Sequence, residues 1–103
     1  MTRKIKVSKL PEFDLAAHLR DDEDIAAYLS VVLEEGDADE LVHALGIAAR
    51  ARGMTEISKA SGITREALYR ALRAGAQPRF DTVAKVCAAL GLKLTVQPAR
   101  QSA

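Results

Sequence analysis

The chain has 103 residues, 49% of them hydrophobic and 4% aromatic, which favours a single domain with a modest core of Ala, Leu, Ile and Val carried on helices. Its net charge of +1 hides a strong asymmetry, because residues 1–10 sum to +4, residues 11–43 to −10 and residues 44–103 to +7. A single cysteine excludes an internal disulfide, and because no signal peptide or membrane-spanning run is recognisable, we expect a cytoplasmic protein.

The N-terminal segment, residues 1–12, is basic. In its part RKIKVSKL, residues 3–10, lysines alternate with apolar residues, which is typical of a short edge strand or of a basic arm. We expect residues 13–97 to form one helical domain. The polar residues 98–103 are expected to be a flexible tail.

Two helices are predicted first in the domain. The segment DEDIAAYLSVVLEE has apolar residues at the spacing of one helical face, with Asp21 or Asp22 as its N-cap. We expect Gly36 to end this helix in the left-handed conformation. Asp37 is expected to cap the next helix, with Glu40 in the capping-box position, and a glycine at position 53 to end it.

The segment TEISKASGITREALYRALR predicts a helix-turn-helix, with a recognition unit of about residues 54–74. A short helix over residues 55–61 is followed by Gly62, which permits a tight turn, and Thr64 then caps a helix that runs to about Arg73. We expect the two helices to pack on each other and on the core through five apolar side chains: Ile57, Ala60, Ile63, Leu68 and Leu72.

The last elements are a fifth helix and a strand. Asp81 is expected to cap the helix and Gly91 to stop it, and the alternating residues 92–98, LKLTVQP, predict a half-exposed C-terminal β-strand. The fold class is therefore mainly α. It comprises five helices, a short C-terminal strand and, if residues 3–10 are extended, an N-terminal strand.

The polar positions of the helix-turn-helix are candidates for DNA contacts. Arg65, at the start of the recognition helix, is the first candidate for a base contact, while Glu66 has the alternatives of accepting from cytosine or orienting Arg70. Tyr69 is a candidate for a thymine methyl or a phosphate. The complete set of candidates is Thr55, Glu56, Lys59, Thr64, Arg65, Glu66, Tyr69, Arg70, Arg73 and Arg79.

Residues 54–92 resemble the Xre/Cro-type helix-turn-helix domain. The pieces ARARGMTEIS, GITREALYRAL, QPRFDTV and KVCAALGLKLTV, with the upstream FDLAAHLRDDEDIAAYLSVVLEEGD, resemble more narrowly the HigA-like family of addiction-module antidote proteins. The resemblance covers roughly residues 13–97. It implies an antitoxin that binds a small RelE/HigB-like toxin, usually a ribonuclease, and represses its own operon as a homodimer on double-stranded operator DNA.

One residue departs from the pattern that this resemblance implies. These domains often carry a DNA-contacting glutamine where this chain has Glu56, whose carboxylate cannot donate to a phosphate and is repelled by it. Glu56 therefore either faces protein or selects a cytosine amino group.

The acidic segment, about residues 13–45, is a candidate surface for the toxin. A ribonuclease toxin binds RNA and is therefore expected to be basic, so that an acidic segment would complement it. The carboxylates that we expect to contribute are Asp21, Asp22, Asp24, Glu34 and Glu35.

Other functions are weaker candidates. His18 and His43 lack partners at metal-ligand spacing, and Cys87 lies on an apolar helical face, so we expect no metal, no cofactor and no enzyme activity. A stand-alone Xre-type repressor without a toxin is the main alternative, and a pure protein-interaction module is the third.

Overall fold

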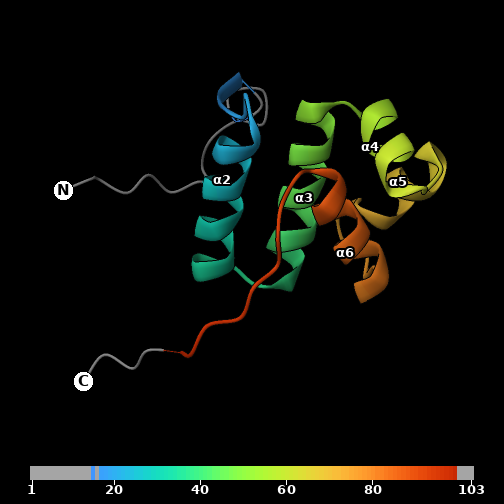
Figure 1. The fold of residues 1–103 in the computed structure, drawn as a ribbon. Helices are drawn as coiled ribbons and strands as arrows, with labels where there is room; N and C mark the ends of the chain where they lie inside the picture. Colours follow the sequence, from blue (N-terminus) through green and yellow to red (C-terminus); the bar gives the residue numbers. More distant parts are fainter. Residues whose placement is uncertain (1–14, 16, 100–103) are drawn as a thin grey trace.

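The computed structural model describes residue 15 and residues 17–99, and the fold of this part is helical. Figure 1 shows the helices in chain order around a central helix, with the C-terminal segment running past it. The helices are α2 (Asp22–Glu35), α3 (Ala38–Arg52), α4 (Met54–Ser61), α5 (Arg65–Ala71) and α6 (Phe80–Ala89).

Helix α2 begins and ends where the sequence predicts. The carboxylate of Asp21 accepts a hydrogen bond from the backbone N–H of Asp24 at 2.9 Å, which satisfies one of the free donors at the helix start. Ile25, Leu29 and Val32 are buried and share one face by their spacing of four and three residues. This face packs α2 against α3.

The turn between α2 and α3 corrects one expectation. Gly36 is extended, with φ −104° and ψ −175°, and not left-handed. A side chain at this position would come within 2.9 Å of the carbonyl oxygen of Val32, so the glycine permits a close approach of the backbone. Asp37 caps α3 as expected, because its carboxylate accepts from the N–H of Glu40 at 3.0 Å.

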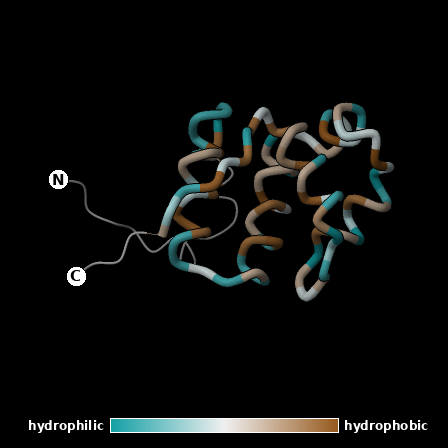
Figure 2. Tube along the Cα trace, turned by 60° about the horizontal axis from the view of Figure 1, so that its bottom comes forward, coloured by the Kyte–Doolittle hydropathy of each residue, from teal (hydrophilic) through white to brown (hydrophobic). Residues whose placement is uncertain are grey.

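Helix α3 is the centre of the core. It packs against α2, α4 and α6, and its buried residues include Leu45, Ala48 and Ala49. Figure 2 shows hydrophobic and hydrophilic residues interleaved along the helical turns, as expected for helices that each bury one side. The core is therefore continuous from α2 to α6.

Helix α6 starts earlier than the sequence predicts. Its N-cap is Arg79, which makes no side-chain capping bond, and the expected cap Asp81 lies inside the first turn. The Asp81 carboxylate instead pairs with Lys85, four residues later, at 3.3 Å, and its charge suits the helix N-terminus. Gly91 follows the helix end with φ +82°, so it stops the helix as predicted.

The strand predicted over residues 92–98 is not formed. Residues 92–98 join no ladder, because a strand needs a neighbouring strand to pair its backbone and the described residues contain none. The expected strand or arm at residues 3–10 lies outside the described residues, as does the end of the expected tail, residues 100–103.

The cap of α3 generates a stability prediction. We expect Asp37→Ala to lower the free energy of unfolding by about 1 kcal/mol, because an amide at the helix start loses its partner. In a thermal melt this corresponds to a decrease in Tm of about 4–8 °C.

The control is Asp39→Ala, which removes an exposed acid of the same first turn that makes no capping bond. We expect it to have the smaller effect of the helix dipole alone, about 0.3–1 kcal/mol. Equal losses for the two variants would contradict the capping role of Asp37.

Candidate nucleic-acid interface

Two short helices, α4 and α5, are joined by a three-residue turn over residues 62–64. Gly62 has φ +77° and ψ +12°, the left-handed conformation that side chains disfavour. Thr64 caps α5, because its hydroxyl oxygen accepts from the N–H of Ala67 at 3.1 Å. The expected turn and cap are both confirmed. Helix α5 itself ends at Ala71, two residues before the expected end.

Two serines that the sequence analysis did not single out hold the turn. The hydroxyl of Ser58 donates to the carbonyl oxygen of Ile63 at 2.6 Å, and the hydroxyl oxygen of Ser61 accepts from the N–H of Ile63 at 3.2 Å. Both backbone groups of Ile63 are thus bound to α4. The sequence signal for this role was the presence of two serines within the four residues before the glycine of the turn.

The inner side of the α4–α5 pair is apolar. Ile57, Leu68 and Leu72 are buried, and Ile63 packs partly against the core. Ala60, the fifth residue expected there, is exposed, and that expectation is wrong. The eight-residue α4 buries only Met54 and Ile57. At about 100° per residue, Ala60 lies roughly 60° from Ile57 and roughly 120° from Met54, at the edge of the buried face.

The outer side of the pair gathers the candidate DNA residues. All ten are exposed, nine of them on α4, the turn, α5 or the residues just after it, and Arg79 at the start of α6. Arg20, Arg52 and Lys85 form ion pairs with acids of the described fold. The four cations of the α4–α5 region, Lys59, Arg65, Arg70 and Arg73, are therefore not used in these internal pairs.

The five acids proposed for the toxin do not form one cluster. Asp21, Asp22 and Asp24 lie at the start of α2, whereas Glu34 and Glu35 lie at its end, roughly 20 Å away along a 14-residue helix.

Three of these acids have structural roles. Asp21 caps α2, Asp22 pairs with Arg52 of α3, and Asp24 pairs with Arg20 at 3.1 Å. The backbone N–H of Arg20 and then its guanidinium hold the pKa of Asp24 below its usual value, so this carboxylate is ionised at neutral pH. Glu34 and Glu35, at the end of the helix, are exposed and take part in none of these contacts.

Cys87 is a core residue, as expected. It is buried on α6, and burial raises the pKa of its thiol, which disfavours the thiolate that a nucleophile needs. Within residues 15 and 17–99, no group of three or more His, Cys, Asp or Glu side chains is arranged to hold a metal ion. None of the described helices is long and apolar enough to cross a bilayer.

These features define a small helical protein with an exposed basic helix pair at one end and an acidic helix at the other. Residues 9–98 match a protein family described as "probable addiction module antidote protein", and the chain belongs to this family. An antidote implies a toxin on which it acts.

One curated relative supports the same extent of homology. It is an uncharacterized protein of Haemophilus influenzae (strain ATCC 51907 / DSM 11121 / KW20 / Rd), 45% identical over 92 residues that cover 89% of this chain and 95% of the relative. No solved structure matches the chain. Membership of the family is therefore shown by sequence similarity alone, and no solved relative supports the geometry of the α4–α5 pair.

The turn provides a direct test of the local geometry. We expect Gly62→Ala to lower the free energy of unfolding by about 1–2 kcal/mol, the cost of a side chain in the left-handed conformation. Nothing lies within 4 Å of the added carbon, so steric crowding contributes no further cost. Chemical denaturation measures the difference.

Gly62→Asn is the matched control, since asparagine tolerates the left-handed conformation better than alanine does. We expect it to lose less stability than Gly62→Ala despite its larger side chain. An alanine variant as stable as wild type would show that the turn in solution does not hold residue 62 at positive φ.

Proposed function

We propose that this protein is the antitoxin of a type II toxin–antitoxin module in the cytoplasm, and a binding protein without enzymatic activity. It binds operator DNA through the α4–α5 pair acting as a helix-turn-helix, represses its own operon as a homodimer, and neutralises a small basic RelE/HigB-like toxin. The observation that carries the DNA-binding proposal is the outer side of the α4–α5 pair, where nine of the ten candidate side chains are exposed.

The chemistry of that outer side suits a nucleic acid. Residues 53–79 contain five basic and two acidic residues, and the basic ones are exposed. Cations on such a face attract phosphates at long range, and a short helix with an arginine near its start suits a major groove. Arg65 is in the first turn of α5, where it would meet base edges, whereas Arg73 follows the helix and would meet the backbone.

Glu56 has two alternative roles, facing the protein or accepting from a cytosine, and its exposure bears on the choice between them. It is exposed in the first turn of α4, so the interpretation that it is turned into the protein loses its basis. We infer that Glu56 accepts from a cytosine amino group, since its carboxylate would be repelled by a phosphate.

The acidic side supports a basic toxin. Residues 21–40 contain nine acids and neither lysine nor arginine, and α3 separates α2 from the α4–α5 pair. A cationic partner would be attracted to this end of the molecule while the basic end stays accessible to DNA. Because Asp21, Asp22 and Asp24 have intramolecular partners, Glu34 and Glu35 are the carboxylates that we assign to toxin binding.

A stand-alone repressor remains the alternative function. It would use the same α4–α5 pair and would have no partner for the acidic helix. Membership of a family of probable antidote proteins favours the antitoxin. Co-purification with the product of the neighbouring gene distinguishes the two, since a stand-alone repressor would bring down no toxin.

The proposed DNA contacts predict different effects for two arginines. We expect Arg65→Ala to cost about 1–3 kcal/mol of operator binding and to relax the preference at one base pair. We expect Arg73→Ala to weaken binding to all sequences alike and to reduce the salt slope by about one. Titrations of operator and scrambled DNA at several salt concentrations separate these effects, and wild-type binding by both variants would show that α5 does not enter the groove.

The proposed toxin contacts predict an effect on association rate. We expect Glu34→Gln/Glu35→Gln to slow association with the neighbouring gene product about two- to tenfold and to flatten its salt dependence, as expected for exposed charges that steer an encounter. Asp81→Asn, an exposed acid on α6, is the control and should keep the wild-type rate. A double variant with unchanged rate and salt slope would leave the end of α2 without a role in toxin binding.

A further inference from the structure

Most of the large apolar side chains that are exposed on the described surface belong to a single groove. Of the five, Leu33, Phe80 and Leu94 line the groove, Val96 follows Leu94 by two residues, and Tyr69 lies apart on α5. Phe80 is 73% exposed and Val96 is 97% exposed. Contiguous apolar surface of this kind marks an interaction site.

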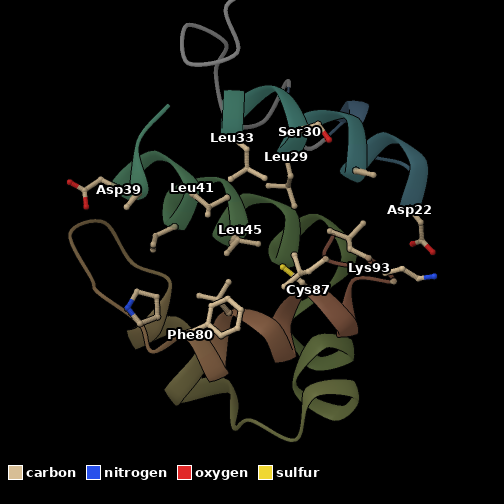
Figure 3. Close-up of a pocket in the computed structure, with 18 of the residues that line it drawn as sticks. Asp22, Leu29, Ser30, Leu33, Asp39, Leu41, Leu45, Phe80, Cys87 and Lys93 are labelled. Atoms are coloured by element: carbon tan, nitrogen blue, oxygen red, sulfur yellow. The ribbon is translucent and has the colours of Figure 1, made fainter. Parts of the chain in front are cut away.

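The groove has a volume of about 850 Å³ and lies between two layers of the fold. Figure 3 shows Leu29 and Leu33 of α2 and Leu41 and Leu45 of α3 on one side, with Phe80 and Cys87 of α6 on the other. The segment after α6 closes one end with Lys93 and Leu94. No residue from 46 to 75 lines it, so its occupant would leave the α4–α5 pair free.

The same surface carries both a hollow and protruding side chains. Phe80 and Leu94 form part of the wall and still expose most or half of their area, and Val96 follows two residues later. In a two-fold interface each copy presents the identical patch, so the patch must supply the protrusion as well as the hole. This groove meets that requirement.

The backbone after α6 also lacks a partner. The N–H of Leu92 donates to the carbonyl oxygen of Cys87 at 2.9 Å, and within the described part of the chain this is the last backbone hydrogen bond. Residues 93–97 form neither helix nor strand. Paired as a strand, they would place Leu94 and Val96, two positions apart, on one side. An identical segment running antiparallel would pair these backbone groups and bring the apolar side chains together.

The charges at the groove are of both signs. Asp22, Glu23 and Asp39 contribute carboxylates to the lining, of which Asp22 already pairs with Arg52, and Lys93 contributes an exposed ammonium. In a two-fold dimer, Lys93 of each copy can lie near the acids of the other copy. A strongly basic toxin would instead meet a charge of its own sign at Lys93. Glu34 and Glu35, assigned to the toxin, do not line the groove.

We propose that the groove and residues 92–97 form the self-association surface of this protein, occupied by a second copy of the chain. The proposal rests on the homodimer of the proposed function and specifies where it forms. The paired segments 92–97 lie across the two-fold axis, Phe80 of each copy is covered, and both α4–α5 pairs remain exposed.

The first experiment measures mass by sedimentation equilibrium over a range of micromolar concentrations. We expect Phe80→Ser and Val96→Asp each to weaken the dimer at least tenfold, because both remove apolar area from its centre. Their exposure in a single copy predicts wild-type helicity and melting of the monomer, which circular dichroism checks. Tyr69→Ser, the exposed aromatic outside the groove, is the control and should retain the wild-type mass.

The second experiment locates the two-fold axis by disulfide formation. In a Cys87→Ala background, single cysteines at positions 94 to 97 are oxidised, and we expect a covalent dimer from at least one position, since a residue near the axis meets its own copy. Ala88→Cys is the control, because Ala88 is exposed on α6 and does not line the groove. Cross-linking at position 88 and at none of positions 94–97 would overturn the proposal.

The outcomes separate this inference from the proposed function. A wild-type chain that stays monomeric with and without operator DNA removes both the homodimer and its surface. A wild-type dimer that Phe80→Ser and Val96→Asp leave intact overturns only the surface. Variants that remain dimeric and lose binding to the neighbouring gene product would assign the groove to the toxin and overturn the second copy as its occupant.

Discussion

The burial of α3 is the constraint on which the other elements depend. Its central residues are small, with Ala44, Gly46, Ala48 and Ala49 among those buried, so that neighbouring helices can approach its backbone closely. A side chain at position 46 would come within 3.0 Å of the carbonyl oxygen of Leu72, at the end of α5. The glycine in mid-helix costs about 1 kcal/mol in helix propensity, which the close packing of this junction offsets. The α4–α5 pair is therefore fixed to the core at its far end as well as through Ile57.

The same helix keeps the two charged ends apart. With α3 between them, the acids of α2 and the cations of α5 are separated by about two interaxial distances, roughly 16–20 Å, which exceeds the Debye length at physiological salt, about 8 Å. Their mutual attraction is largely screened, and each end presents its own sign of charge to solvent. The exception is the ion pair of Asp22 with Arg52, which joins α2 to the last turn of α3. That pair ties the acidic helix to α3 and offsets the charge of one carboxylate on the surface that a partner would meet.

Local features were predictable from the sequence and tertiary ones were not. The caps at Asp21, Asp37 and Thr64 and the turn at Gly62 depend on residues within three positions of each other, so their residue types determine them. Residues 92–98 have the alternation of a strand, but a strand also needs a partner, which the pattern cannot supply. Among the five acids, the contacts of Asp21 and Asp24 are local, whereas the pairing of Asp22 with Arg52, 30 positions away, could not be read from residue spacing. Likewise, the groove depends on how α2, α3 and α6 meet, which residue spacing within any one helix does not report.

Helix α6 links the proposed DNA and dimer surfaces. It packs against α4 on one side, and its residues Phe80, Val83 and Cys87 line the groove on the other. A close-packed core deforms little, so the packing of α5 on α4 and of α4 on α6 fixes the direction of α5 relative to the two-fold axis. In the proposed dimer this geometry sets the distance between the two recognition helices, and hence the spacing of operator half-sites. The end of α2, where Glu34 and Glu35 lie, is outside this connection. A toxin bound there would leave the distance between the recognition helices unchanged, and so would permit a complex of toxin, antitoxin and operator.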